Sequence, residues 1–417
     1  MLTWLRNTFV NAGRYKEHPE AVIISCFYNP QNSAPRYEAF KKWYDSIKHL
    51  NHLIVECLID GAESQLPKSS SIIQVKSDST LWHKESLLNL AVSKLPAKYK
   101  YVFWVDADVI FTNLNWLTEG VKELEHGAQI LQPFEYCFHL EKGESEPGFD
   151  TDEAISDLIN DNKRNPRMWR SFSANFVDLE EDCESTDYNT HGHVGFAWGA
   201  TRELLEQVPL YDKALVGGAD HIIAHAAANQ IPSNCIDKSF TEDLDAVYAW
   251  SRKFAREVDG GIAYVPGNLY HLWHGDIKSR EYLKRVQEFT PTTKQITEKD
   301  ENGLYVAKDG KDQYVKEYFQ KREKGSPTPN TTKVVRVNTT QHHHHNHGGG
   351  YGYGSTHHYH WNMGGGGGGG YTGRNNSNIN GSYVPENKSV TLPSEDTTNI
   401  NPELPSEDMS NATENFS

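Results

Sequence analysis

Strand-like and helix-like segments alternate along the first part of this chain, and that alternation constrains its fold more than any other feature. Short apolar runs bounded by turn residues are typical of buried strands, and apolar residues three and four positions apart are typical of helices. Alternation of the two favours an α/β domain, with a mainly parallel central sheet flanked by helices. The predicted strands are Ala21–Phe27, His52–Ile59, Ile72–Val75 and Tyr101–Val105, and the predicted helices span 37–50 and 81–95.

Polar residues follow these predicted strands where each one ends. In an open parallel sheet, ligands bind beyond the carboxyl ends of the strands. We therefore expect four segments to share one edge of the sheet: Phe27–Pro30, which includes Asn29, then Asp60-Gly61, the loop 76–84, and Asp106–Asp108.

The remaining chain divides by composition. A lead segment (1–20) precedes a body (21–290) and a helical extension (291–325), and residues 326–417 hold histidine, glycine, asparagine and threonine runs, including Gln341–His347. Such a composition cannot bury enough apolar area to offset its chain entropy, so we expect a disordered tail. In the second half of the body we expect helices over 150–161, 201–207, 220–228 and 279–289, and a turn at Pro266-Gly267 between the segments 262–265 and 269–274.

Charge and cysteine content exclude several classes of protein. The net charge of −15 argues against general affinity for nucleic acid or anionic lipid. Five cysteines among 417 residues are too few for a disulfide framework. No apolar run approaches the roughly 20 residues that cross a bilayer, and Met1–Gly13 lacks the apolar core of a signal peptide. We therefore expect a reduced, cytoplasmic protein with no membrane segment.

The acid pair Asp106-Ala107-Asp108 is the strongest chemical feature. It follows the apolar run Phe103–Val105, so both carboxylates emerge together at the tip of a buried strand. Paired carboxylates suit Mg²⁺ or Mn²⁺, and such an ion can bridge a pyrophosphate and stabilise a departing nucleoside diphosphate. The same pattern also opens phosphoaspartate hydrolases, in which Asp106 would be the nucleophile, although that motif normally lies on the first strand.

Three further motifs carry chemistry, each with a simpler structural explanation. Lys84 begins a helix just before the acid pair and could meet phosphates, or be an ordinary surface charge. Asp220, after Gly217-Gly218, could be a general base, although its local sequence favours a helix N-cap. His271 and His274 could both face a metal or be hydrogen-bonded structure.

Taken in order, these motifs resemble the GT-A-type, nucleotide-sugar-dependent glycosyltransferases, and in the second half most closely the β-1,4-galactosyltransferases and family-2-like enzymes. Those families carry an apolar strand ending in Asp-x-Asp, a glycine-rich stretch before Thr-Arg-Glu, a Gly-Gly-Glu-Asp segment and a later histidine ligand. The corresponding segments here are Asp106–Asp108, Gly195–Gly199 before Thr201-Arg202-Glu203, Gly217–Asp220 and His271–His274, and the resemblance covers about 21–285.

The resemblance implies a GT-A-like domain that uses Mn²⁺ or Mg²⁺ to move a sugar from a nucleotide diphosphate-sugar, expected to be UDP-linked, to an acceptor hydroxyl with inversion. It implies Asp108, His274 and His271 as metal ligands and Asp220 as the catalytic base. It further implies that Asp60, Lys84 and Asp106 contact the donor, and we expect Asn29, at the same edge of the sheet, to contact the donor as well. The acceptor could be a glycan, a lipid or a protein.

Two departures from the galactosyltransferase pattern leave the acceptor open, because Ala219 replaces an acidic residue and Val216 replaces a tryptophan. Three alternatives therefore stand beside the transferase. They are a phosphoaspartate-type phosphohydrolase, a catalytically inactive nucleotide-sugar-binding module, and a metal-binding or tethering protein acting through its His-rich tail.

Overall fold

A computed structural model describes residues 13–160, 165–179, 188–240, 243–275, 280 and 282–323. The start of the lead segment and the expected disordered tail (326–417) lie outside these residues. The described strands are β1 (Ala21–Phe27), β2 (His52–Ile59), β3 (Ile72–Ser77), β4 (Tyr101–Val105), β5 (Val109–Phe111), β6 (Ile130–Gln132), β7 (Tyr136–His139), β8 (Met168–Arg170), β9 (Ala197–Thr201), β10 (Ile262–Tyr264) and β11 (Asn268–His271).

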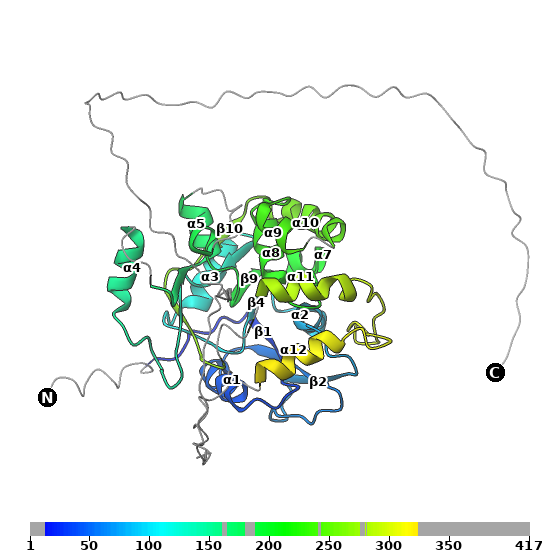
Figure 1. Cartoon of the computed structure of the whole chain (residues 1–417). Helices are drawn as coiled ribbons and strands as arrows, with labels where there is room; N and C mark the ends of the chain where they lie inside the picture. The colour runs from blue at the N-terminus through cyan, green and yellow to red at the C-terminus, as the bar shows by residue number, and fades with distance from the viewer. Residues whose placement is uncertain are drawn as a thin grey trace, which may run out of the picture. The chain divides into compact units, whose positions relative to one another are not determined.

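The described helices surround these strands (Figure 1). They are α1 (Ala34–Ile47), α2 (Lys84–Lys94), α3 (Trp116–Glu125), α4 (Thr151–Ile159), α5 (Phe172–Leu179), α6 (Tyr188–His191), α7 (Arg202–Gln207), α8 (Ala219–Ala227), α9 (Asn234–Ser239), α10 (Leu244–Val258), α11 (Tyr282–Thr293) and α12 (Gln313–Glu323).

The central sheet has seven strands in the order β10-β6-β9-β4-β1-β2-β3. All neighbouring pairs are parallel except those that β9 makes with β4 and β6. The predicted α/β class with a mainly parallel sheet is therefore confirmed. A second sheet, which the sequence analysis did not predict, has four strands in the order β5-β11-β7-β8.

Alternate side chains of the central strands enter two separate cores. In β1, Val22 and Ile24 pack with α2, α7, α8 and α10, whereas Ala21 and Ile23 pack with α1 and α3. In β4, Trp104 belongs to the first core and Phe103 to the second. Successive strand side chains point to opposite faces, so a strand covered by helices on both faces must be apolar at every position. This explains the continuous apolar runs of the sequence.

The C-terminal helices of the described chain complete the first core. Val315, Tyr318 and Phe319 of α12 are buried there, and the Phe319 ring stacks on Trp82 with ring centroids 5.7 Å apart. The segment expected as a helical extension thus shares its packing with the sheet, at least as far as residue 323.

Helix α8 begins differently from the sequence interpretation. Its N-cap is Gly218 with φ of 101°, and Gly217 before it has φ of 86°, a backbone region that favours glycine. A Cβ atom on Gly217 would lie 3.2 Å from Trp82 and one on Gly218 would lie 2.9 Å from Phe240. The interpretation of Asp220 as an N-cap is therefore wrong, because Asp220 lies in the first turn and its carboxylate is directed elsewhere.

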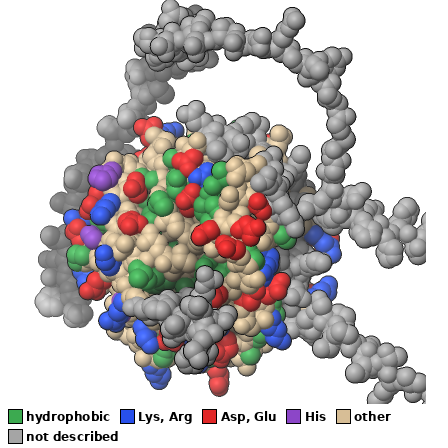
Figure 2. All heavy atoms as spheres, turned by 90° about the vertical axis from the view of Figure 1, so that its left-hand side faces the viewer, with side chains coloured by type: hydrophobic (Ala, Val, Ile, Leu, Met, Phe, Trp, Pro, Cys, Tyr) green, Lys and Arg blue, Asp and Glu red, His purple; other side chains and the backbone are tan. Residues whose placement is uncertain are grey.

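The surface agrees with the acidic composition. Figure 2 shows acidic side chains gathered near the middle of one face, with basic ones mainly towards its margins. Within the described residues, no helix combines the length and apolar character needed to cross a membrane. The four described cysteines, Cys26, Cys57, Cys137 and Cys235, are free thiols.

Candidate active site

A cavity of about 330 Å³ opens where β1 and β4 end. These strands are parallel neighbours with Ile24 opposite Trp104, so Tyr28 and Asp106 arrive together at the cavity wall. Its volume lies at the lower end of the range for small-molecule sites. The expected edge of the sheet is thus hollowed beside the acid pair.

Asp108, His271 and His274 come together at this cavity, and their potential ligand atoms all lie within 4.8 Å of one another. Pairing between β5 and β11 is responsible, since His271 lies opposite Val109 and the Leu272 amide donates to the Asp108 carbonyl at 2.8 Å. The second sheet therefore joins two motifs that lie far apart in the sequence.

The protonation states of these residues suit a cation. Burial lowers the pKa of His274 to about 4 and that of His271 well below its ordinary value, so both rings are neutral at pH 7. Burial acts to raise the pKa of Asp108, but His271, the hydrogen bond with His274 and the charge of Arg280 hold it below its usual range. A carboxylate and two neutral imidazoles are the forms that bind a divalent metal.

The hydrogen-bond geometry also fits a metal. His274 Nε2 lies 2.9 Å from Asp108 Oδ2 and 2.8 Å from Arg280 Nη2, yet one ring nitrogen cannot donate to the carboxylate and accept from the guanidinium together. Asp108 Oδ1 is buried and has no hydrogen-bond partner among the residues that the structure describes. Adjacent ligands about 2.1 Å from an octahedral Mg²⁺ lie roughly 3 Å apart, close to the separation of Nε2 and Oδ2.

The Lys84 side chain lies between Asp106 and Asp220, the other two acidic residues expected in the site. Its Nζ lies 2.8 Å from Asp106 Oδ1 and 3.1 Å from Asp220 Oδ1. Burial acts to lower the pKa of Lys84, but the two carboxylates outweigh it and raise that pKa well above its ordinary value. Burial raises the pKa of Asp106 to about 6, against the opposing effect of Lys84. The ammonium group therefore stays charged and holds the two acids together.

Two expected donor contacts lie elsewhere. Asp60 is exposed, accepts a hydrogen bond from the Thr80 hydroxyl at 3.1 Å and lies 3.4 Å from Lys316 Nζ. Asn29 is buried and bonds Ser33 and Gln65. Among the described residues that line the cavity, neither of the two occurs.

Sequence reasoning missed several residues of the cavity wall. Arg280 reaches both histidines, and the Arg285 guanidinium lies 4.5 Å from the ring centroid of Trp82. Both arginines belong to the segment predicted as a basic amphipathic helix, and Trp82 belongs to the loop 76–84. The available signal was therefore a cluster of basic residues, but nothing local indicated which of them turn inward.

Comparison with known proteins gives distant similarity only. No family model matches the chain, and no curated protein matches it. The catalytic domain of Drosophila β1,4-galactosyltransferase 7, solved with xylobiose, is 12% identical over 61% of this chain and 65% of its own, with a TM-score of 0.24. The glucosyl-3-phosphoglycerate synthase of Mycobacterium tuberculosis, solved with Mn²⁺, UDP-glucose and phosphoglyceric acid, is 13% identical over 68% of this chain and 79% of its own, with a TM-score of 0.30.

A second complex of that synthase, with Mn²⁺, UDP-glucose and glycerol 3-phosphate, covers 72% of this chain at 13% identity, with a TM-score of 0.31. This chain is thus similar to glycosyltransferases of known structure. With TM-scores this far below 0.5, function has to be argued from the side chains of the cavity.

Proposed function

We propose that this protein is a metal-dependent glycosyltransferase that moves a sugar from a nucleotide diphosphate-sugar, UDP-linked, to an acceptor hydroxyl with inversion. The observation that carries the proposal is the convergence of Asp108, His271 and His274 on a cavity that Lys84 and Asp220 also line. Ligands for a divalent cation, a fixed positive charge and a carboxylate base then surround one space of small-molecule size.

The charge of the cavity supports an anionic ligand. A divalent ion bound at Asp108 would give the cavity a net positive charge, because the basic and acidic side chains of its lining are equal in number: Arg36, Lys84, Arg280 and Arg285 against Glu85, Asp106, Asp108 and Asp220. Cations gathered in a concave site attract phosphate groups, and arginine can contact them through two nitrogens at once. A nucleotide diphosphate supplies the negative charge that this lining would balance.

Asp108, His271 and His274 would hold Mn²⁺ or Mg²⁺ in this proposal. When bound, the ion would offset the charge of the diphosphate. Arg280 would have to withdraw from the two ring nitrogens before the ion binds there, and in this proposal its guanidinium would turn to a phosphate of the donor. Asp106 would contact the donor sugar or ribose next to the ion.

Asp220 would act as the base. The acceptor O–H bond breaks, its proton passes to the Asp220 carboxylate, and the acceptor oxygen bonds to the anomeric carbon as the bond to the nucleoside diphosphate breaks. Attack opposite the leaving group inverts the anomeric centre. For this step Asp220 must exchange its contact with Lys84 for one with the acceptor, and Lys84 is then available to the departing diphosphate.

The decisive experiment incubates the full-length protein with Mn²⁺ and a panel of nucleotide-sugars and measures released nucleoside diphosphate, first without and then with candidate acceptors. We expect turnover with UDP-sugars that falls by more than about 100-fold in Asp108→Ala, because loss of a residue that only hydrogen-bonds to a metal ligand already costs about 10–100-fold. Asp45→Ala, which removes an exposed acid of α1, is the matched control. Full turnover in Asp108→Ala would exclude the metal assignment.

The rival functions give different outcomes in the same assay. A phosphoaspartate hydrolase would release phosphate from small phosphoesters without any acceptor and would lose that activity in Asp106→Asn. An inactive binding module would be stabilised by UDP-sugar and Mn²⁺ without turnover, with a shift of about 2.7 kcal/mol when the ligand is 100-fold above its dissociation constant.

A further inference from the structure

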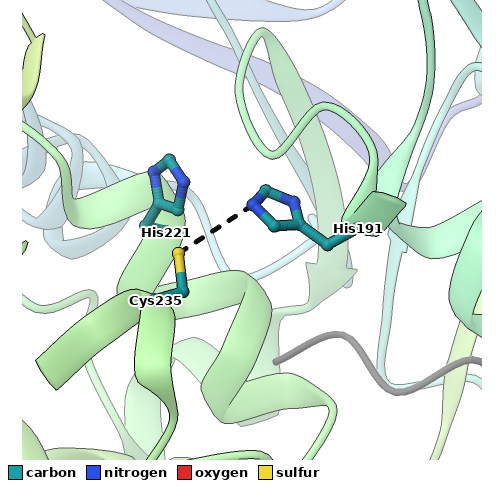
Figure 3. A group of neighbouring side chains, drawn as sticks. All are labelled: His191, His221 and Cys235. Atoms are coloured by element: carbon teal, nitrogen blue, oxygen red, sulfur yellow. Dashed lines mark hydrogen bonds between the residues drawn. The ribbon is translucent and has the colours of Figure 1, made fainter. Parts of the chain in front are cut away.

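A second cluster of potential metal ligands lies beside the cavity, where side chains of α6, α8 and α9 meet. Its member on α8 directly follows Asp220 in the sequence. It consists of His191 from α6, His221 from α8 and Cys235 from α9, whose potential ligand atoms lie within 4.8 Å of one another. Figure 3 shows the two rings and the sulfur directed towards a common space. None of the three belongs to the Asp108 cluster.

Local structure orients the first ring for this purpose. His191 Nδ1 lies 2.7 Å from the Gly192 carbonyl, to which it donates, so Nε2 carries the lone pair. Nε2 faces Cys235 Sγ at 3.9 Å. A backbone carbonyl that holds the opposite ring nitrogen is the arrangement that metal-binding histidines usually have.

A fourth candidate ligand lies one turn further along α8. His225 follows His221 by four positions, which places both rings on one face of the helix. Its ring centroid is 5.5 Å from that of His191 and 6.3 Å from that of His221. Within the described part of the chain, both ring nitrogens of His225 are buried without a hydrogen-bond partner, which is costly for an imidazole unless a ligand satisfies one of them. His225 is not in the group whose ligand atoms lie within 4.8 Å of one another, so its ring must turn towards the other three to bind the same ion.

The environment keeps these rings in the metal-binding form. His191, His225 and Cys235 are buried and His221 is partly buried, and burial disfavours the charged form of an imidazole. Neutral imidazoles beside a thiol make a nitrogen and sulfur donor set. Such a set selects Zn²⁺ rather than the hard ions that favour a site with a carboxylate.

We propose that His191, His221 and Cys235 bind a structural Zn²⁺ ion, with His225 as the fourth ligand. On binding, the Cys235 thiol loses its proton to solvent and its sulfur becomes a thiolate ligand. The ion would join α6, α8 and α9. Because α8 also carries Asp220, and His221 itself lines the cavity, the zinc site would hold the proposed base in position without taking part in the reaction.

The test uses the full-length chain with its tail histidines replaced by serine (His342–His345, His347, His357, His358 and His360), since those residues can bind metal themselves. After dialysis against a weak chelator, we expect one zinc per chain. Asp108→Ala should retain that zinc and Cys235→Ser should lose it. Cys57→Ser, at another buried free thiol, is the matched control and should retain it.

Substitution with cobalt gives an optical absorption band that requires a cysteine thiolate as a ligand. Replacing zinc with Co²⁺ should produce a thiolate-to-cobalt charge-transfer band that is present in Cys57→Ser and absent in Cys235→Ser. If Cys235→Ser does not fold, the parent protein still decides the matter. A band that appears with one equivalent of Co²⁺, together with a Tm that falls on strong chelation and returns with Zn²⁺ but not Mn²⁺, supports the site.

Three results would overturn the proposal. They are a parent protein that retains no zinc and gives no thiolate band, zinc that is lost with Asp108 rather than with Cys235, and a Cys235→Ser variant with undiminished zinc content. Each of these measurements is made without substrate. Failure of the zinc site and failure of the transferase proposal are therefore distinguishable.

Discussion

Lys84 Nζ lies 3.1 Å from Asp220 Oδ1, although 136 positions separate the two residues in the chain. The same ammonium group reaches Asp106 at 2.8 Å. One lysine at the start of α2 thus links the acid pair after β4 to the first turn of α8. This contact fixes the distance between the proposed donor and base residues.

Replacing Lys84 with methionine should destabilise the protein, because two carboxylates would face each other without a cation. Loss of one partner from a fully buried ion pair costs about 3–5 kcal/mol, and we expect roughly 2–3 kcal/mol because both acids retain some solvent contact. Urea unfolding at pH 7 and pH 5 measures this effect. The loss should be smaller at pH 5, because burial raises the pKa of Asp106 to about 6 and this carboxyl can then take up a proton.

Lys100→Met is the matched control for that variant, since Lys100 forms an exposed pair with Glu20. It should unfold much as the parent protein does. Equal loss of stability at pH 5 and pH 7 in Lys84→Met would contradict the electrostatic explanation.

Replacing Asp220 with asparagine should keep donor binding and abolish transfer, because asparagine has nearly the same shape but cannot accept the proton. We expect turnover to fall by about 10²–10⁴-fold, the contribution typical of a general base. Calorimetric titration with a UDP-sugar and Mn²⁺ should give a dissociation constant within a few-fold of the parent value. If transfer persists, Asp220 has a structural role in pairing with Lys84.

Replacing Arg280 with glutamine should strengthen Mn²⁺ binding in the absence of nucleotide. The guanidinium lies 2.8 Å from His274 Nε2 and 3.3 Å from His271 Nε2, so it competes with a cation for the same lone pairs. Removing it should lower the Mn²⁺ dissociation constant by about tenfold, given charge repulsion at this range. Titration with Mn²⁺, followed by the electron paramagnetic resonance signal of the free ion, measures this dissociation constant. Arg256→Gln, at an exposed arginine, is the control. A weaker affinity would show that Arg280 supports the ligand geometry.

Replacing Glu85 with glutamine should change how stability depends on pH. Burial raises the pKa of Glu85 to about 8, against the opposing effect of Lys84, from an ordinary value of 4.5. Between these two pH values the folded state holds a proton that the unfolded chain releases, so this group makes stability fall as pH rises. Unfolding free energies at pH 5, 6.5 and 8 should decline less steeply in Glu85→Gln. An unchanged slope would mean that Glu85 is ionised in the folded protein.

Replacing Gly199 with alanine should destabilise the central sheet. Gly199 of β9 lies directly opposite Phe103 of β4, and a Cβ atom there would lie 2.4 Å from the Phe103 ring. Such overpacking typically costs about 1–3 kcal/mol. Phe103→Leu should recover part of that loss when combined with Gly199→Ala, a coupling that urea unfolding of the single and double variants measures.

Local patterns in the sequence were sufficient for much of the first half of the fold. The predicted strands β1, β2 and β4 agree with the structure at both ends, and the helices predicted over 37–50 and 81–95 correspond to α1 and α2. Strands buried on both faces have continuous apolar runs, so their signal lies within each segment.

The rest of the body was predicted in part. The helices expected over 150–161, 201–207, 220–228 and 279–289 correspond to α4, α7, α8 and α11, whereas the strands between β4 and β10 were missed because they are short and their signal is not local. β5 and β6 have three residues each, and β9 contains Gly199, which a strand tolerates here only because Phe103 fills the space above it. Helix α10 was also missed.

For the candidate site, the sequence by itself determined that Asp106 and Asp108 emerge where a buried strand ends, because hydrophobic periodicity is a property of neighbouring residues. It also indicated Lys84, Asp220, His271 and His274 as candidates, but not how they meet. Only the tertiary structure decided that β11 lies beside β5, bringing His271 and His274 to Asp108, that Lys84 lies between two acids, and that Cys235 faces His191. Those contacts join residues far apart in the chain, and their energies depend on burial and distance, which no local pattern contains.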